Sequence, residues 1–289
     1  MLHSLSPLEF QTHLDLLSAN CFGSGSSNAQ TFYLLGSFGT ALSKEKHESL
    51  RPLFVFIVSQ ALKHCQDLTA NSLHALGLFV DSLLREKSWI VSQYMLELIL
   101  AFVAKVSLDT LVHRYGYDVE DNRSSLYLQL TRTCSSVLLF HRHRINGRYH
   151  LVLRALISLL GCLTVKSEWN CSGISSALAY SRLIGNLCEP PVQSIREKGG
   201  KSNLTSSATL TKKALARHLP VFLANYIYAS LNEGFTGEVS ESLKPGIYNV
   251  FAVLGTEGVK ATSGMVDSSG RAYLKILYED YTKNGKWQA

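Results

Sequence analysis

The sequence lacks the motifs that mark common enzyme classes. It contains no Gly-x-Ser-x-Gly nucleophile elbow and no phosphate-binding G-x-x-x-x-G-K-[ST] loop. Its six cysteines form no C-x-x-C pair, which argues against a zinc ribbon or a thioredoxin-type site. His141 and His143 of "HRHR" stand two apart and so point to different sides of a helix. The sequence therefore predicts a protein that is not an enzyme, with no catalytic, cofactor-binding or metal-binding residue.

Long apolar runs are also missing. The apolar stretches at 53–58 and 96–106 are too short or too interrupted to cross a bilayer. Without a secretory signal at the N-terminus, we expect an intracellular protein with reduced cysteines. Charged residues make up only 17% of the chain and hydrophobic residues 46%, so the chain can build a core. The net charge of +6 permits contact with nucleic acid or an acidic partner but does not require it.

No alternating apolar–polar pattern is long enough for a strand, whereas helical spacing recurs almost throughout. Helices are expected at about 7–21, 29–42, 49–64, 69–85, 89–105, 108–114, 121–140, 147–163, 172–188, 210–230, 245–255, 259–265 and 268–284. The segment 189–209, rich in Pro, Gly and Ser, is expected to be a flexible loop within the same domain. We predict a single all-α domain over 1–289, an irregular α-solenoid of the armadillo or HEAT type with degenerate repeats.

Particular residues set the expected helix ends. Asp121 or Asn122 is the expected N-cap of the helix that follows. Pro220 is expected to kink or break the helical segment 210–230, because proline removes a backbone hydrogen bond. Pro245 is expected in the first turn of a helix that stops near Gly255, since a first turn tolerates the missing N–H.

The last helix carries an aromatic stripe. Ser268 or Ser269 is its expected N-cap, and Asn284-Gly285 its expected stop. Trp287 follows the stop and is expected to fold back over the last turn. The spacing of the stripe predicts a core-facing surface, with a docking surface as the alternative; its members are Tyr273, Leu274, Leu277, Tyr278 and Tyr281.

Two groups of basic residues are candidate contacts for RNA or an acidic partner. Arginine suits phosphate because its planar guanidinium donates two parallel hydrogen bonds. The alternative is structural, because cations also satisfy helix-end carbonyls. The first group surrounds a turn between two apolar helices and contains Arg142, Arg144, Arg148 and Arg154. The second lies in the predicted loop and the helix after it and contains Arg196, Lys198, Lys201, Lys212, Lys213 and Arg217.

Three segments together resemble the C-terminal domain of the nucleolar pre-ribosomal-associated protein 2 family, of the Urb/Npa type. They are "HRINGRYHLVLRALISLLGCL", "LKPGIYNVFAVLG" and "SSGRAYLKILYEDYTKNGKW". The resemblance covers 126–289, whereas residues 1–116 are compatible with it only in their helical character. The positions that match the family are expected to be structural or docking residues; they are Gly147, Arg148, Tyr149, Pro245, Gly246, Tyr248, Gly270, Arg271, Tyr278, Tyr281 and Trp287.

The resemblance implies a nuclear, nucleolar scaffold that acts in early large-ribosomal-subunit assembly and pre-rRNA processing. It also implies partners: a related large scaffold protein, a DEAD-box helicase and small accessory proteins, with pre-rRNA as a further candidate and no membrane. Family members are much longer, so the chain is expected to be a C-terminal fragment or a truncated product. The alternative function is a helical adaptor of the armadillo or HEAT type unrelated to ribosomes, because fold alone does not decide function.

Overall fold

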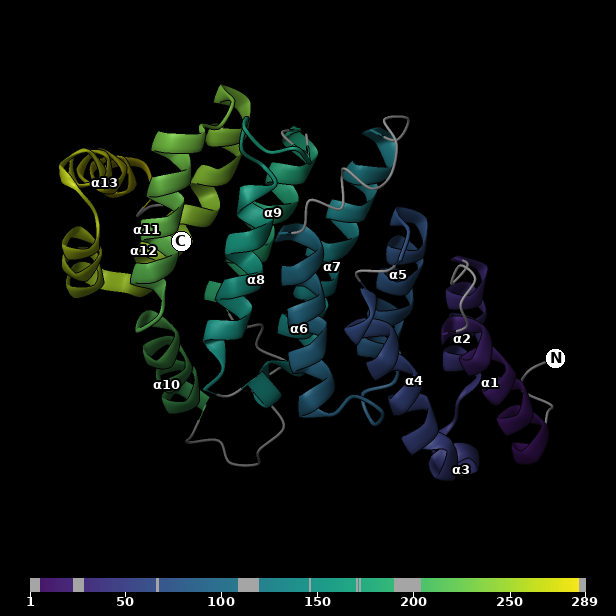
Figure 1. The fold of residues 1–289 in the computed structure, drawn as a ribbon. Coiled ribbons are helices and arrows are strands. Elements are labelled where there is room, and N and C mark those ends of the chain that lie inside the picture. The colour runs from purple at the N-terminus through teal and green to yellow at the C-terminus, as the bar shows by residue number, and fades with distance from the viewer. Residues whose placement is uncertain are drawn as a thin grey trace. The chain divides into compact units, whose positions relative to one another are not determined.

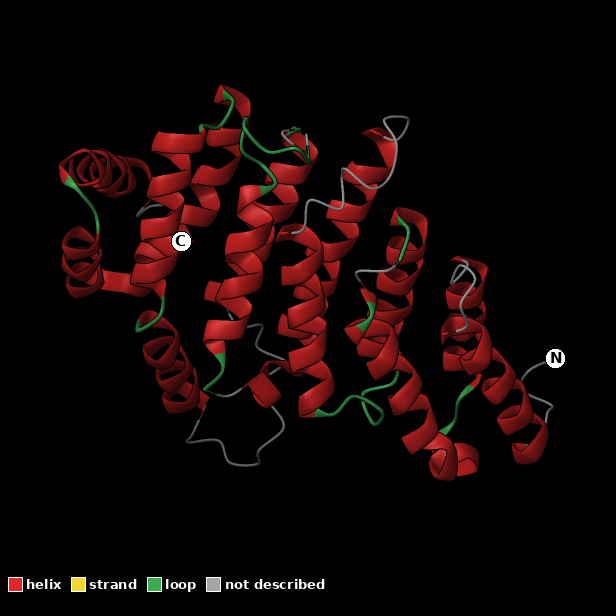
Figure 2. Cartoon of the chain, in the orientation of Figure 1, coloured by secondary structure: helices red, strands yellow, loops and turns green. Residues whose placement is uncertain are grey.

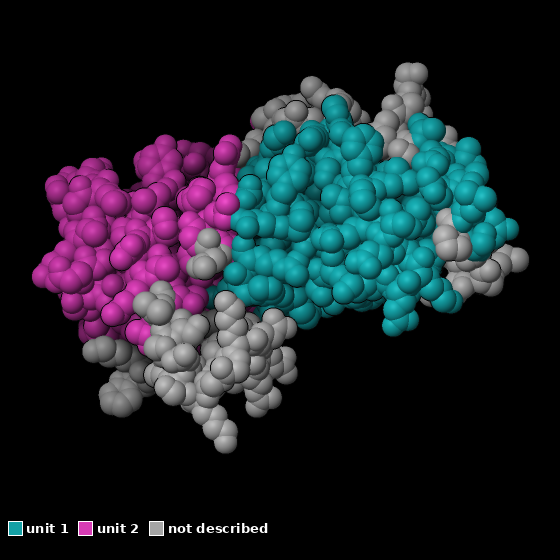
Figure 3. Space-filling model, turned by 90° about the horizontal axis from the view of Figure 1, so that it is seen from below, with its two compact units in different colours: residues 1–144 teal, residues 145–289 magenta. Residues whose placement is uncertain are grey.

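The computed structural model describes residues 6–22, 29–65, 68–108, 120–145, 147–169, 171, 173–189 and 204–285. Within these ranges the regular secondary structure is helical and includes no strand, which confirms the all-α prediction for this part of the chain (Figure 2). None of the helices described is long and apolar enough to cross a membrane. The chain divides into two compact units, residues 1–144 and 145–289 (Figure 3).

Over its described residues, unit 1 is built from seven α-helices and a short 3-10 helix at Glu48–Leu50 (Figure 1). The α-helices are α1 (Pro7–Phe22), α2 (Ala29–Ala41), α3 (Lys44–His47), α4 (Arg51–Lys63), α5 (Ala70–Glu86), α6 (Gln93–Leu108) and α7 (Glu120–Ile145). Helix α2 packs along α5, and α4 packs on α6. The rings of Phe54 and Phe79 meet edge to face at 5.8 Å in this core, a geometry that aromatic pairs favour.

The ends of the unit 1 helices follow local chemistry. Thr69 caps α5 by accepting a hydrogen bond from the N–H of Ser72, as expected of a threonine at this position. Lys87, just after α5, donates to the carbonyls of Thr40 and Leu42 at 2.9 and 2.7 Å. This cation stabilises the C-terminal end of α2, where carbonyls lack helical partners.

Helix α7 differs from its prediction at both ends. It begins at Glu120, so Asp121 lies inside its first turn and the predicted N-cap at Asp121 or Asn122 is wrong. Acidic residues are favoured in the first turn as well as at the cap, and this explains the shift. The helix also continues to Ile145 rather than ending near residue 140. Of the helix predicted at 108–114, residues 109–114 lie outside the described residues.

Unit 2 contains α8 (Tyr149–Gly161), α9 (Ile174–Cys188), α10 (Leu204–Ala216), α11 (Leu219–Tyr228), α12 (Gly237–Met265) and α13 (Ser268–Asp280). Two π-helical turns follow α11 and α13, at Ala229–Glu233 and Tyr281–Gly285. Helix α12 packs on α9 and α11, and α11 also packs on α8. The hydroxyl of Tyr180 in α9 donates to the carbonyl of Leu156 in α8 at 2.8 Å, which joins these two helices.

The two predictions about prolines in the unit 2 helices have different outcomes: that for Pro220 is confirmed and that for Pro245 is wrong. The predicted helix 210–230 splits before α11, and Pro220 lies in the first turn of α11, which confirms the break. Helix α10 begins at Leu204, so the predicted loop 189–209 extends too far; residues 190–203 lie outside the described residues. The first-turn prediction for Pro245 is wrong, because α12 begins at Gly237 and contains this proline.

Helix α9 explains how α12 accommodates Pro245. The next residue, Gly246, donates its backbone N–H to the hydroxyl of Ser181 in α9 at 2.9 Å. A side chain at Gly246 would place its Cβ 3.0 Å from the Ser181 carbonyl oxygen, so glycine permits close approach of the two helices. Farther along, Gly255 has φ 62° and ψ −175°, which interrupts α12 and confirms the predicted stop.

Cysteines contribute to both cores as thiols. Those whose side chains are described are all buried, and they are Cys65, Cys134, Cys162, Cys171 and Cys188. Burial raises the pKa of the Cys134 thiol to about 12 and that of Cys162 well above its usual value. The side chain of Cys21 lies outside the described residues.

Candidate functional site

The basic residues at the end of α7 make contacts within unit 1. Arg142 is buried, with only 6% of its surface exposed. Arg144 donates from Nη1 to the carbonyl of Ser88 at 3.1 Å and to that of Val91. These carbonyls lie in the loop between α5 and α6 and obtain a charged donor from α7. The burial of Arg142 and the hydrogen bonds of the half-buried Arg144 favour the structural alternative for these two arginines.

The histidines of the same segment have different surroundings. His141 is fully buried, and its Nε2 lies 2.8 Å from the carbonyl oxygen of Leu84 in α5. Burial lowers the pKa of His141 to about 4, so the ring is neutral at pH 7. His143 is exposed. Over the described ranges, no three His, Cys, Asp or Glu side chains are grouped as metal ligation would require.

A buried carboxylate links α5 to α7 beside these residues. Oδ2 of Asp81 lies 3.0 Å from Nε of Arg85 and 2.9 Å from Nε of Arg132. The Ser136 hydroxyl, which is buried, donates to Oδ1 of Asp81. The Arg85 guanidinium also lies over the ring of Phe140 at 5.9 Å. This network satisfies a charge that would otherwise be costly to bury, and none of its polar members is among the predicted site residues.

The remaining basic candidates belong to unit 2, and those that the structure describes face solvent. Arg148 immediately precedes α8, and Arg154 lies on it; both are exposed. Before them, Gly147 adopts φ 79°, a conformation that favours glycine, and Tyr149 is buried. Near the end of α10 the exposed cations are Lys212, Lys213 and Arg217. Arg196, Lys198 and Lys201 lie outside the described residues.

The net positive charge of the chain belongs to unit 2. Unit 2 carries sixteen Lys and Arg against ten Asp and Glu, a net charge of +6, whereas unit 1 carries twelve of each. A surface of one sign attracts partners of the other sign over roughly 8–10 Å at physiological salt. Unit 2 is therefore the part of the chain whose charge favours an acidic partner or RNA.

The terminal helix packs on α12 and α11. Its N-cap is Asp267, whose Oδ1 accepts from the N–H of Gly270 at 2.7 Å, so the predicted cap at Ser268 or Ser269 is wrong. Gly270 is buried, and a Cβ there would lie 2.8 Å from Cβ of Val266. The helix continues as a π-helical turn that ends at Gly285, within the predicted stop at Asn284-Gly285. Arg271 is exposed, and Trp287 lies outside the described residues.

Aromatic rings fill the contact between α12 and the end of α13. Phe251 lies 5.4 Å from the ring of Tyr281 and 5.5 Å from that of Tyr278. The ring of Tyr248 lies 5.9 Å from that of Tyr281. Leu274, Leu277 and Tyr281 are buried, whereas Tyr273 and Tyr278 are half-buried. The greater part of the stripe therefore serves as a core surface of unit 2.

The carboxylate of Asp280 accepts hydrogen bonds at the edge of this aromatic contact. The Tyr248 hydroxyl donates to Oδ2 of Asp280 at 2.6 Å, and Asn284 donates to Oδ1 at 2.7 Å. The hydrogen bond from Tyr248 lowers the pKa of Asp280, with a smaller contribution from the charge of Lys244. Because the folded pKa is lowered, this stabilisation is present at neutral pH and is lost as the pH falls through that pKa.

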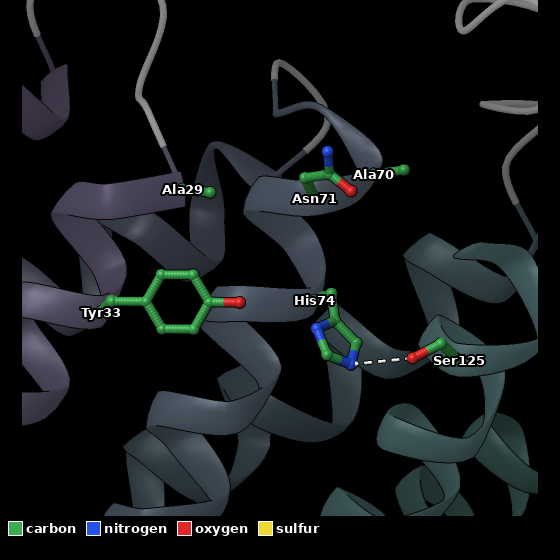
Figure 4. A pocket seen from close by; sticks show the side chains of 6 residues that line it. All are labelled: Ala29, Tyr33, Ala70, Asn71, His74 and Ser125. Atoms are coloured by element: carbon green, nitrogen blue, oxygen red, sulfur yellow. Dashed lines mark hydrogen bonds between the residues drawn. The ribbon is translucent and has the colours of Figure 1, made fainter. Parts of the chain in front are cut away.

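A polar recess of about 330 Å³ lies in unit 1 (Figure 4). It is lined by Ala29 and Tyr33 from α2, by Ala70, Asn71 and His74 from α5, and by Ser125 from α7. Nε2 of His74 lies 3.1 Å from Oγ of Ser125. A nucleophilic serine needs a base oriented by a third group, and none of the described lining residues carries a carboxylate. The pair is best explained as a hydrogen bond between α5 and α7.

Comparison with known proteins identifies one family. No curated protein and no solved structure matches the chain. The model of the Urb2/Npa2 family matches residues 75–289, which begins inside α5 and extends beyond the region 126–289 that carries the sequence resemblance. The match includes the Asp81 network, the exposed cations of unit 2 and the aromatic contact of α13. The chain therefore belongs to the Urb2/Npa2 family, a family of ribosome biogenesis factors.

Proposed function

We propose that the chain is a non-enzymatic scaffold in early assembly of the large ribosomal subunit, that it supports pre-rRNA processing, and that it acts in the nucleolus. The family match over residues 75–289 carries this proposal. The proposed partners are a related large scaffold protein, a DEAD-box helicase, small accessory proteins and pre-rRNA. The exposed cations of unit 2 support the choice of acidic or nucleic-acid partners.

We further propose that the helices form a single irregular α-solenoid over 1–289. The support comes from unit 2, where α8 packs beside α9 through Tyr180, and both α9 and α11 pack on α12. In a solenoid each helix pair contacts its neighbours and the last helix covers an apolar face. The packing of α13 on α11 and α12 fits such a closing role.

Purification of the tagged chain from cells tests the scaffold proposal. We expect large-subunit precursors and their assembly factors to copurify, and the chain to be enriched in the nucleolus. A folded, expressed chain that recovers no ribosomal precursor would contradict the proposal. Diffuse or membrane-associated localisation would instead support the adaptor function. Circular dichroism of the purified chain establishes that the helices are intact.

The exposed arginines of α8 give a sharper test of RNA binding. Replacing Arg148 and Arg154 together by glutamine should weaken RNA binding and lower its dependence on salt, with the logarithmic salt slope falling by about one for each phosphate that is no longer neutralised. Filter binding of pre-rRNA fragments between low and physiological salt measures both effects. The double variant should keep the melting temperature of the natural chain, because both side chains are exposed.

Arg271→Gln provides the matched control, since Arg271 is an exposed arginine on another helix of the same unit. It should leave the RNA affinity unchanged. If the double variant and the control bind equally well at every salt concentration, Arg148 and Arg154 do not contact RNA.

A further inference from the structure

One side of α11 presents apolar side chains to solvent. Val221, Tyr228 and Leu231 are 49%, 58% and 45% exposed. Their spacing places them on the same side of the helical segment that runs through α11 and its π-helical turn. The opposite side is buried in unit 2 and carries Phe222, Leu223, Tyr226 and Ile227.

The turn after α8 extends this apolar side. The N–H of Val165 donates to the carbonyl of Gly234 at 2.9 Å, and Nζ of Lys166 donates to that of Asn232 at 2.5 Å. These bonds hold Val165, which is 60% exposed, next to the end of the π-helical turn. We define the α11 face as Val165, Val221, Tyr228 and Leu231.

Polar groups within the α11 face turn back onto the helix. The side-chain amide of Asn225 donates to the carbonyl of Val221 at 2.8 Å, and that of Asn232 to the carbonyl of Tyr228 at 3.2 Å. These amides therefore donate to backbone carbonyls near the π-helical turn. Turns of this kind are found often at functional positions. The residues that define the face are apolar, and exposed apolar side chains gathered on one side of a helix mark interaction sites.

The charges before the Val221 end of the α11 face are positive. From Leu204 to Asn232 the only charged residues are Lys212, Lys213 and Arg217, and all three are exposed. Lys166 adds a cation at the other end of the face. This second end also carries the acids Glu168 and Glu233, so its charge is mixed. A partner that covers this face therefore meets apolar side chains with a cationic end next to Val221.

We propose that the α11 face binds an acidic amphipathic helix of a partner protein. Such a helix offers an apolar stripe to Val221, Tyr228 and Leu231, and carboxylates to Lys213 and Arg217. Aliphatic side chains favour protein over RNA, because single-stranded RNA is bound mainly by stacking on aromatic rings between cations. The inference deepens the proposed scaffold function, on which it rests, by giving the chemistry of one partner surface.

Site-specific crosslinking tests the inference. In the tagged full chain, Tyr228 is replaced by the photoreactive residue p-benzoylphenylalanine. Cells that express this chain are irradiated, and the crosslinked peptides are identified by mass spectrometry. The expected main product joins position 228 to a protein peptide with the pattern of an acidic amphipathic helix. In such a peptide apolar residues recur three or four positions apart, and acidic residues lie between them. The same probe at Ile276, which is 63% exposed on α13, is the control and should give at least threefold less of this product.

Charge reversal tests the complementarity. Lys213→Glu with Arg217→Glu should lower the yield at position 228 at least threefold, while Arg271→Glu should not; equal melting temperatures exclude unfolding. Any of four results would overturn the inference. Two concern the product, which would be crosslinked to RNA or to a peptide without acidic residues. The other two concern the yield at position 228, which would be no higher than at position 276 or would be unchanged by the charge reversal. Precursor recovery from the same purification is scored separately, so failure of the α11 face and failure of the scaffold function are distinguishable.

Discussion

Replacing Tyr281 by alanine should lower the free energy of unfolding by about 3–5 kcal/mol. The Tyr281 ring is buried and stacks on Phe251 at 5.4 Å, and the rings of Tyr248 and Tyr278 lie 5.9 and 6.0 Å from it. Alanine would leave a cavity at the contact between α12 and the end of α13. For a unit of this size the melting temperature should fall by roughly 10 °C or more. Calorimetry and urea unfolding measure the two quantities.

Ile276→Ala is the matched control, because Ile276 lies on the same helix but is 63% exposed. Its cost should stay within about 0.5 kcal/mol. Equal melting temperatures for the two variants would show that Tyr281 does not stabilise unit 2. If Tyr281→Ala melts normally but no longer enters ribosomal precursors, the stripe is a docking surface instead.

Asp81→Ala should destabilise the chain by about 2–4 kcal/mol. The substitution removes the carboxylate that accepts from the buried Ser136 hydroxyl and lies 2.9 Å from Nε of Arg132 and 3.0 Å from Nε of Arg85. The expected cost is limited because both arginines are partly exposed and regain water. Urea unfolding followed by circular dichroism measures the decrease in stability.

Two further variants separate the contributions at Asp81. Asp81→Asn keeps an acceptor for Ser136 but removes the charge, so its cost should fall between those of Asp81→Ala and the natural chain. Glu86→Ala is the surface control on the same helix, since Glu86 is exposed, and it should cost less than about 0.5 kcal/mol. A cost for Asp81→Ala no larger than the control would show that the network contributes nothing.

Most of the helices were predictable because burial on one side imposes helical spacing on the apolar residues. Pro220 was interpreted correctly, since a proline with no neighbouring compensation ends a helix. Pro245 was not, because its compensation comes from Ser181 in α9, far away in the sequence. The caps shifted by short distances, from Ser268 or Ser269 to Asp267, because neighbouring residues had similar capping ability.

The candidate site was less predictable, because exposure depends on partners that spacing does not reveal. Arg142 and Arg154 look alike in sequence, yet one is buried and the other faces solvent. Asp81 lay on the buried side of α5, and a single acid in an apolar stripe was the available signal. Its partners Arg132 and Ser136 lie on α7, and nothing local associates them with α5. The α11 face was missed for the same reason, since Val221 and Tyr228 fit any apolar helix.

The buried cysteines allow local unfolding of each unit to be measured by thiol labelling. Thiol reagents attack the thiolate, and burial raises the pKa of Cys134 to about 12 and that of Cys162 well above its usual value. Labelling therefore requires the surrounding helices to separate, and its rate measures the free energy of that local event. Cys65 and Cys134 belong to unit 1, and Cys162, Cys171 and Cys188 to unit 2. Peptide mapping after a labelling pulse therefore measures the rate of local unfolding in each unit separately, without any substitution in the chain.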